Sequence, residues 1–461
     1  MASGSLGQRP ECRGISAVRT PCYGSLEKLK SQGDFMDRRQ ALQIATGAIS
    51  LVAFQADAAE KAVAASAAMA GKTPEDVARD EDYWTEIRNA FTIDRNVINF
   101  NNGYASPAPI PVQDAMRRYL SYSDMGPIQT MVNVLYPQIE RVRENLARVA
   151  GCDPEEMAIT RNASEANEIV QYGIDLKPGD EVLTTDQDYP RMLMTFRQRE
   201  RRDGIKLVTV SFPVPVTSAD DLYERIARAV TPKTKLILIC HITNRTGVIF
   251  PVRRIADMAH AKGIPLMVDG AHAFNHFPFK LSDLNCDYYG VSLHKWTCAP
   301  IGTGFLYVRK SRIAQTWSLF SSDVKQVNDI RKFEEVGTHP AANPNAISEA
   351  LVFNENIGIG RKAARLRYLR DRWAHRLREN PKVKILHSES PELSCGIGFI
   401  GFNGVDAGKM YETLYTKHNI VTARVELPGQ YDGLRVTPHI YSTLRDVDTF
   451  ADTVEKELAT T

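Results

Sequence analysis

The chain has 461 residues, of which 43% are hydrophobic and 24% are charged. This composition is typical of a globular protein with a hydrophobic core, and the length suits two or three domains. The 57 lysines and arginines are nearly balanced by 55 aspartates and glutamates. The balance argues against binding to nucleic acid or to a membrane surface, because such binding needs a concentrated positive field.

The spacing of cysteine and histidine gives no sign of a metal site. The seven cysteines contain no C-x-x-C pair, and the ten histidines contain no H-E-x-x-H motif. We therefore expect neither a structural zinc site nor a disulfide framework. No apolar run reaches the roughly 18 residues that span a bilayer, so we expect no stable membrane anchor.

The first 70 residues contain a pattern typical of export. Arg38 and Arg39 precede the apolar stretch 41–54, and Ala56-Asp57-Ala58 follows as a candidate cleavage site. A charged start, a short apolar segment and small residues define a secretory signal, and paired arginines resemble the twin-arginine type. We predict a signal and linker over 36–70 and a periplasmic protein, with an ordinary amphipathic helix as the alternative. Residues 1–35 are an extension of unassigned role.

From about residue 150 to residue 310, apolar β-rich runs alternate with segments of helical period. Strands are expected at 181–185, 205–210, 234–240, 265–269, 288–293 and 304–308, and helices at 218–230 and 252–262. This alternation with short links predicts an α/β fold with a mostly parallel sheet and helices on both faces. Ligands bind such sheets beyond the carboxyl ends of the strands.

The last 130 residues have a different rhythm, with long helical stretches and few strands. Strands are expected at 396–402 and 420–424, and helices start near Val405 and Asp446. We predict three regions after the signal. They are an N-terminal arm at 80–115, a large domain at 116–330 and a smaller α+β domain at 331–461.

Two motifs that suggest other functions are interpreted as structural. The basic run 197–202 (RQRERR) is expected to be a solvated helix end rather than a phosphate-binding patch. Residues 358–363 fit the pattern G-x-G-x-x-A, but they follow a helix-like segment and lack a surrounding βαβ unit. We therefore expect a helix break there rather than the dinucleotide site of a dehydrogenase.

An acid and a lysine stand at the ends of two buried strands. Asp269 closes the strand PLMVD, and Lys295 follows the strand that ends near Leu293. Pyridoxal 5′-phosphate (PLP) is a cofactor that needs both groups. The lysine bonds its aldehyde carbon, and the acid keeps its pyridine nitrogen protonated, so that the ring withdraws electrons.

Several ordered motifs resemble the class V aminotransferase family of fold-type I PLP enzymes. They are TRNASEA (160–166), CHITNRTG (240–247), VDGAH (268–272), SLHKW (292–296), Gly337-Thr338 and RVTPHIYST (435–443). The resemblance covers about residues 85–455. It implies a large domain with a mostly parallel, seven-stranded sheet and a smaller α+β domain. It also implies a Schiff base at Lys295, which moves the Cα proton, with Asp269 at the pyridine nitrogen.

The resemblance assigns further residues to the cofactor. His272 is expected at its phenolic oxygen, and Tyr189 or its neighbour Asp188 over the ring face. Asn244 and His241 are expected at the strand end, facing the cofactor. The phosphate is expected to contact Ala163, Ser164, Ser292 and His294, since a helix start favours an anion. Thr338 matches the position from which relatives reach the phosphate of the partner subunit, so a homodimer with shared active sites is expected.

For the substrate, the resemblance implies that Arg435 binds the α-carboxylate, since a guanidinium meets a carboxylate through two hydrogen bonds. Asn102 lies in a loop that resembles the substrate-side loop of the family. The expected substrate is an amino acid, free or within a peptide. The stretch 424–435 contains no cysteine, whereas cysteine desulfurases of the family carry their nucleophile shortly before this arginine.

Within the family, the motifs look most like those of isopenicillin N epimerases and of exported PLP enzymes of pyoverdine maturation. Chemistry at the Cα-amino group, by transamination or epimerisation, is therefore predicted, together with a role in periplasmic siderophore maturation. The alternatives are an epimerase or aminotransferase for small amino acids or β-lactam precursors, and a non-catalytic PLP-fold binding protein.

Overall fold

The computed structural model describes residues 57–460. The predicted apolar signal stretch 41–54 and the extension 1–35 lie outside the described residues. The end of the predicted linker lies inside them, as a helix over residues 57–68. Its Ser66 hydroxyl is 3.2 Å from the Tyr83 hydroxyl, and Arg361 donates hydrogen bonds to the carbonyls of Ser66 and Met69. This part of the chain therefore packs on the folded body.

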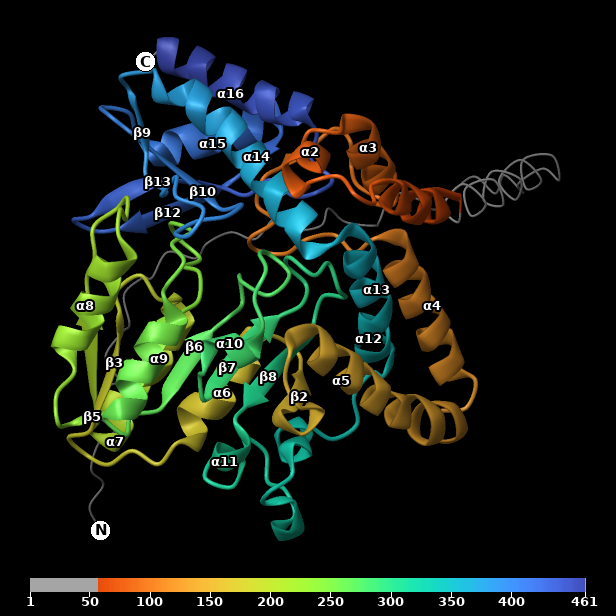
Figure 1. Cartoon of the computed structure of the whole chain (residues 1–461), viewed down its shortest axis with the longest axis vertical. Coiled ribbons are helices and arrows are strands. Elements are labelled where there is room, and N and C mark those ends of the chain that lie inside the picture. Colours follow the sequence, from red (N-terminus) through yellow and green to blue (C-terminus); the bar gives the residue numbers. More distant parts are fainter. Residues whose placement is uncertain (1–56, 461) are drawn as a thin grey trace, which may run out of the picture. The chain divides into compact units, whose positions relative to one another are not determined.

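A seven-stranded sheet forms the centre of the larger part of the molecule (Figure 1). Its order is β2 (Met157–Thr160), β8 (Gly304–Val308), β7 (Tyr288–Ser292), β6 (Leu266–Asp269), β5 (Thr234–Cys240), β3 (Glu181–Thr185) and β4 (Lys206–Val210). Only β8 runs antiparallel to its neighbours, β2 and β7. The predicted α/β class and the mostly parallel sheet are confirmed.

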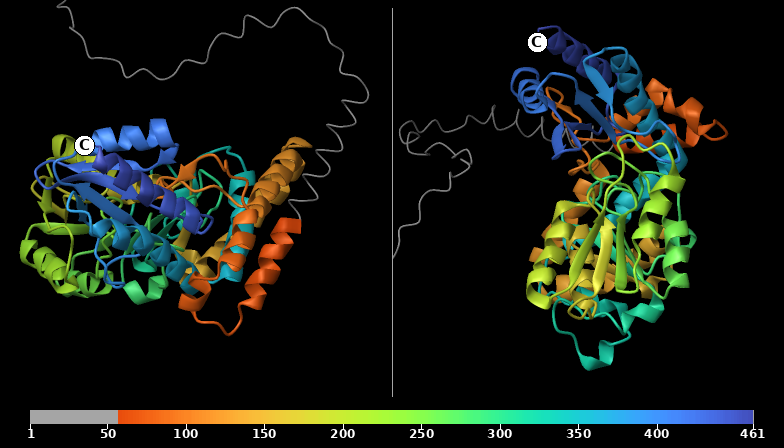
Figure 2. Two further views of the ribbon diagram at one scale, coloured as in Figure 1. Left: turned by 90° about the horizontal axis from the view of Figure 1, so that it is seen from above. Right: turned by 90° about the vertical axis from the view of Figure 1, so that its left-hand side faces the viewer.

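Strand β5 explains why a continuous apolar run forms this sheet. Leu236 and Leu238 pack into one hydrophobic cluster, and Ile237 and Ile239 pack into another. Side chains alternate across a strand, so a strand covered on both faces must be apolar at every position. The covering helices are α6 (Ala163–Gly173), α7 (Pro190–Asp203), α8 (Ala219–Ala229) and α9 (Val252–Ala261). The right view of Figure 2 shows helices on both sides of the strands.

A second, antiparallel sheet lies near the C-terminus. Its order is β12 (Ala423–Leu427), β13 (Tyr431–Val436), β10 (Gly398–Phe402) and β9 (Val383–Ile385). Three long helices, α14 (Ile359–Arg378), α15 (Ala407–His418) and α16 (Leu444–Ala459), accompany it in Figure 1. The hydrophobic cluster that includes Trp373, Leu434 and Phe450 joins the sheet to these helices.

The predicted strand 420–424 is divided in the structure. β11 (Ile420–Val421) pairs in parallel with β1 (Ile98–Asn99), while β12 starts at Ala423 and pairs with β13. The chain changes partner at the buried Thr422. The local sequence cannot reveal such a change, because both halves are extended chain.

The remaining helices precede these two sheets or lie in connections within and between them. They are α2 (Pro74–Ala78), α3 (Glu81–Asn89), α4 (Ile110–Asp124), the π-helix η1 (Ile128–Leu135), α5 (Tyr136–Ala150), η2 (Pro154–Glu156), α10 (Leu281–Leu284), α11 (Lys310–Ile313), η3 (Val324–Gln326), η4 (Ile330–Glu334), α12 (Ala342–Asn345) and α13 (Ile347–Ile357). Within residues 57–460, none of the helices is both long enough and apolar enough to cross a bilayer.

The structure describes both motifs that were interpreted as structural, the G-x-G-x-x-A pattern at 358–363 and the basic run 197–202. α13 ends before Gly358, whose φ of 85° favours glycine, and α14 starts at the next residue, which confirms the predicted helix break. The basic run 197–202 lies in the last turns of α7 and is mostly exposed. Arg199 is the exception to the predicted solvated end. It is buried and donates to the carbonyls of Gln171 and Ile174.

Candidate active site

The polar residues of the site come from the carboxyl ends of neighbouring strands. Asp269 is the last residue of β6, and Ser292 is the last residue of β7. β6 and β7 are parallel neighbours, so their ends meet at one edge of the sheet. Lys295 lies in the loop that leaves β7, which brings it to the same edge. The fold thus explains how residues 26 positions apart in sequence face one another.

The Lys295 amine is held by an imidazole. Its Nζ lies 2.9 Å from Nε2 of His272. Burial lowers the pKa of the Lys295 amine to about 8; the charge of Asp269 opposes this effect and that of Arg435 adds to it. Burial holds the pKa of His272 well below its usual value, and the positive charges of Lys295 and Arg435 lower it further. Near neutral pH, His272 is therefore a neutral ring, and its Nε2 can accept a hydrogen bond from the Lys295 amine.

Asp269 is buried, with 4% of its surface exposed. One carboxylate oxygen accepts a hydrogen bond of 3.0 Å from the backbone N–H of Ala271. Burial raises the pKa of Asp269, and the Ala271 N–H, the charge of Lys295 and the Asn167 amide lower it in part. A cationic partner, such as a protonated pyridine nitrogen, would stabilise the ionised carboxylate at this depth.

The start of helix α6 lies against the ends of β7 and β8. The Ala163 backbone N–H donates to the Ser292 hydroxyl at 3.0 Å, and the Asn162 side chain caps the helix. The approach depends on glycine, since a Cβ at Gly304 would lie 2.7 Å from the Asn162 Cα. The helix start can therefore present backbone N–H groups to an anion at the strand ends. Ser164 is the second residue of α6 and is partly buried.

Arg435 lies on β13 and points its guanidinium toward the same region. Nη1 donates to the Asn244 carbonyl at 2.8 Å, and Nη2 donates to Oδ1 of Asn101 at 2.7 Å. Burial lowers the pKa of Arg435 to about 10, while Tyr189 opposes this shift. Among residues 57–460, no carboxylate forms an ion pair with this buried guanidinium. An anion supplied by a ligand would fill that role.

Tyr189 precedes the first turn of α7 and is partly buried, and it raises the pKa of Arg435. Asn244 is joined to Arg435 through its carbonyl. Asn102 behaves differently from the expectation. Its side chain bonds the carbonyls of Asn99 and Thr437 and accepts from Tyr441, so it is occupied within the fold. Its neighbour Asn101 is the residue that contacts Arg435.

Thr338 is not brought to this cluster within one chain. It lies in the loop after η4 and is exposed. The loop is held by the Tyr136 hydroxyl, which accepts from the His339 N–H and donates to the His339 carbonyl. An exposed Thr338 is compatible with a contact to a second subunit, which remains a prediction.

The cluster contains buried polar atoms that have no hydrogen-bond partner within the described chain. They are Asn244 Oδ1, His272 Nδ1, His294 Nδ1 and Arg435 Nε. Burial also lowers the pKa of His294 to about 4, with Lys295 adding to the effect. Buried polar atoms are rarely left unpaired. A polar ligand with anionic and hydroxyl groups, such as PLP with an amino acid, fits this set.

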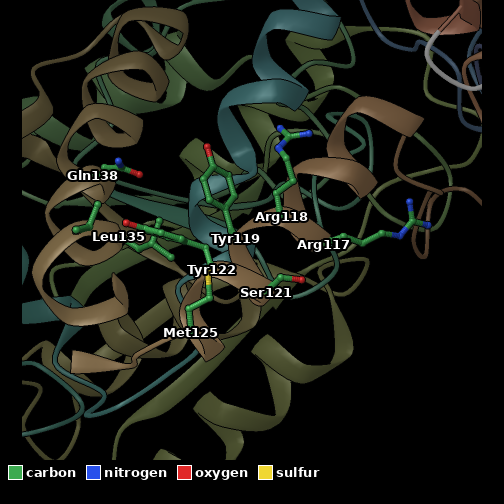
Figure 3. A pocket seen from close by; sticks show the side chains of 9 residues that line it. Arg117, Arg118, Tyr119, Ser121, Tyr122, Met125, Leu135 and Gln138 are labelled. Atoms are coloured by element: carbon green, nitrogen blue, oxygen red, sulfur yellow. The ribbon is translucent and has the colours of Figure 1, made fainter. Parts of the chain in front are cut away.

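The cavity of about 690 Å³ shown in Figure 3 lies elsewhere. It is lined from α4 by residues that include Arg117, Tyr119 and Met125, and from η1 and α5 by Leu135 and Gln138. None of the predicted site residues lines it. The chemistry-bearing groups and this cavity are therefore separate features.

Two features of the site were missed or misjudged from the sequence. Asp188 was expected only as an alternative to Tyr189 over the ring face, yet its side chain is fully buried. His241 was expected to face the cofactor, but its ring packs edge-on against Phe277 and Phe279 and bonds the Tyr289 hydroxyl. The position of Asp188 three residues after a buried strand was the available signal.

Comparison with known proteins identifies relatives of this chain. The family model "Aminotransferase class-V" matches residues 98–450. Isopenicillin N epimerase of Amycolatopsis lactamdurans is 30% identical over 82% of this chain and 98% of its own length. The epimerase of Streptomyces clavuligerus is 28% identical over 81% and 98%. A probable cysteine desulfurase of Halobacterium salinarum is 31% identical over 57% of this chain and 66% of its own length.

Solved structures show the same fold. The apo cysteine desulfurase of Thermococcus onnurineus NA1 has a TM-score of 0.71 at 24% identity, covering 83% of this chain and 98% of that chain. A mutant of the lyase C-DES, with glycine covalently linked to its PLP cofactor, also has a TM-score of 0.71, at 21% identity over 79% and 98%. The predicted family is confirmed. The chain belongs to the class V aminotransferase family, whose membership indicates pyridoxal 5′-phosphate as its cofactor.

Proposed function

We propose that this protein is a PLP-dependent enzyme that epimerises or transaminates an amino acid at Cα, with Lys295 bonding the cofactor. The observation that carries the proposal is that three groups lie together at the carboxyl edge of the central sheet. These are an amine whose pKa is lowered to about 8, a buried carboxylate and a buried guanidinium without a carboxylate partner. They match a covalent tether, a partner for the ring nitrogen and a carboxylate clamp.

Each group has a distinct task in the proposed reaction. When bound, PLP supplies an electron-withdrawing ring that stabilises negative charge at the substrate Cα. Asp269 holds a proton on the ring nitrogen. Arg435 binds the α-carboxylate and fixes the direction of the Cα–H bond. The Lys295 amine, oriented by His272, would remove the Cα proton from one face.

Epimerisation is favoured over transamination by the relatives. The isopenicillin N epimerases match over 98% of their own length. Inversion at Cα also requires proton delivery to the face opposite Lys295. The Tyr189 hydroxyl, which acts on Arg435, is the candidate donor. We expect Tyr189→Phe to abolish inversion while Cα–H exchange persists.

Desulfuration is not part of the proposal, although several relatives are named as probable cysteine desulfurases. The thiolate is the nucleophilic form of cysteine. Cys240, Cys298 and Cys395 are buried, and burial raises the pKa of each thiol. The hairpin of β12 and β13, which ends near Arg435, contains no cysteine.

The cofactor attachment is tested by visible absorption. Purified protein with added PLP is expected to show a band that borohydride bleaches, with the label retained on the peptide that contains Lys295. Lys295→Ala is expected to lack the band. Lys310→Ala, at an exposed lysine of α11, is the matched control and should keep it. Protein that stays colourless with excess PLP would favour the non-catalytic alternative.

The reaction type is tested in deuterated water. Amino acids and short glutamyl peptides are incubated with the enzyme and analysed by mass and by chiral chromatography. Epimerisation predicts that deuterium enters at Cα, that products of both Cα configurations form, and that no nitrogen is lost. Loss of the amino group with formation of a keto acid would instead establish transamination.

A second candidate function concerns the place of the reaction. The paired Arg38 and Arg39 before an apolar stretch favour export, and hence modification of a residue within a secreted peptide. Under this proposal the enzyme is periplasmic and acts in siderophore maturation, for example on a glutamyl group of pyoverdine. Inversion at Cα or loss of the amino group in glutamyl peptides, with no change in free glutamate, would support it. Recovery of the enzyme only from the cytoplasm would contradict it.

A further inference from the structure

A second buried carboxyl group lies close to Asp269. Asp188 follows β3 by three residues and has no exposed surface. Its Oδ2 accepts from the hydroxyls of Thr184 at 3.1 Å and Thr185 at 3.3 Å. Its Oδ1 accepts from the Cys240 thiol at 3.2 Å. All three partners are neutral donors.

The sheet register brings Asp188 toward the cofactor site. Cys240, which contacts Asp188, is the last residue of β5, and its pairing partner on β6 is Asp269. The two carboxyl groups therefore stand on either side of one strand end. Lys295 and Asn167 act on Asp269, whereas no lysine or arginine in residues 57–460 forms an ion pair with Asp188.

We propose that Asp188 is a positioning residue that is protonated below neutral pH, so that Asp269 alone carries negative charge opposite the cofactor's ring nitrogen there. Two ionised carboxylates in a dry site with one adjacent amine would repel each other. Burial and the charge of Asp269 raise the pKa of Asp188 to about 7, and the three hydrogen bonds lower it in part. The titratable groups that face Asp188 are Asp269 and Cys240, and burial keeps the Cys240 thiol neutral.

The inference rests on the proposed attachment of PLP at Lys295, but its first test does not. Infrared spectra of the full chain are compared between wild type and Asp188→Asn at pH 6. We expect the carbonyl band of a protonated carboxyl group in wild type and its loss in Asp188→Asn. Asp269→Asn should weaken the band without abolishing it, because the charge of Asp269 raises the pKa of Asp188 but burial is the larger cause. A wild type without this band, or a band that persists in Asp188→Asn, would overturn the proposal.

A second variant covers the case in which Asp188→Asn does not fold. Cys240→Ala removes the thiol that donates to Oδ1 and leaves the acid in place. The carbonyl band is then expected to shift in frequency, because the carbonyl loses a hydrogen bond. A band that stays unshifted would assign the protonated group to another residue.

The effect on the cofactor is tested by titrating the visible band of the holoenzyme with pH. In wild type, ionisation of Asp188 above neutral pH adds negative charge and opposes proton loss from the lysine-bound cofactor. Asp188→Asn is therefore expected to move the transition down by about half a pH unit or more. Asp186→Asn, which changes an acid bonded to Ser211 and Gln430, is the control and should not move it. Identical transitions in wild type and Asp188→Asn would refute a role toward the cofactor, whereas failure of the chain to bind PLP would refute the proposed function alone.

Discussion

Two charges act on the Lys295 amine in opposite directions. Arg435 lowers its pKa and Asp269 raises it, while burial is the largest effect and brings the value to about 8. A nucleophilic amine must be neutral, so the pH at which Lys295 captures its cofactor reports these neighbours directly.

We predict that the rate of PLP capture by the apoenzyme rises with pH through about 8, since the neutral fraction of Lys295 grows there. Arg435→Gln removes a positive charge, raises the pKa of Lys295 and moves the midpoint up. Asp269→Asn removes a negative charge and moves it down. Stopped-flow absorbance measures both shifts. Arg424→Gln, on the exposed face of β12, should leave the midpoint in place; shifts of the opposite sign would contradict the assigned neighbours.

Residue identity in a turn is harder to predict than residue identity at a strand end. Asp269 and Lys295 were found because buried strands end beside them. Whether Asn101 or Asn102 is free to face the substrate depends on Tyr441, which donates a hydrogen bond to Asn102. Tyr441 is 339 positions away, so the local sequence gives no sign of this contact. The burial of Asp188 was not predictable for a similar reason, since it depends on a contact with Cys240, which lies on another strand.

At the scale of the elements, α6 and β7 show how closely a helix must approach the sheet to serve the site. A Cβ at Gly290 would lie 2.2 Å from Asn167 Oδ1 and 3.3 Å from Ala166 Cβ. The absence of a side chain at this one position of β7 lets the helix start reach Ser292.

Gly290→Ala is therefore predicted to push α6 away from β7. Overpacking of this kind costs about 1–3 kcal/mol of unfolding free energy, and PLP affinity should fall as well, since the helix start moves. Urea unfolding and a PLP binding titration measure the two effects. Gly360→Ala, in helix α14, is the control. A Cβ at Gly360 would meet only Pro74, at the ordinary contact distance of 3.6 Å. Unchanged PLP affinity in Gly290→Ala would separate α6 from the cofactor site.

The elements of the central sheet were predictable because each strand is a short apolar run between turn residues. Strands β3, β5 and β8 have the expected bounds. The strand 420–424 was predictable as extended chain but not as two strands. Its division at Thr422 depends on β1, which pairs with β11 from more than 300 residues away.

For the whole molecule, a homodimer is predicted, with Thr338 of each chain completing the site of the other. The exposed apolar side chains of α4 and η1 are consistent with a face that a partner covers. They include Leu120, Tyr122, Met125, Ile128 and Val132. Met125→Glu with Ile128→Glu is expected to convert a dimer to monomers, measured by sedimentation velocity. A wild type that sediments as a monomer would contradict the prediction.

A hybrid experiment tests the sharing of sites. Thr338→Val is expected to weaken PLP binding about tenfold or more, since a phosphate contact is worth about 1.5–3 kcal/mol. Mixed dimers of Lys295→Ala and Thr338→Val chains contain one site in which both residues are intact. Cofactor affinity should return to the wild-type value in half of the sites. If Thr338 acts within its own chain, no intact site forms and affinity stays low.

The pairing of Asn101 with Arg435 has a consequence for biosynthesis. These two residues are 334 positions apart, and β1 next to Asn101 pairs with β11 near the C-terminus. A ribosome must therefore deliver almost the entire polypeptide before Asn101 and β1 find their partners. The lysine, its acid and the helix start are translated well before then, so the groups proposed for the cofactor are complete in the nascent chain before those proposed for the substrate.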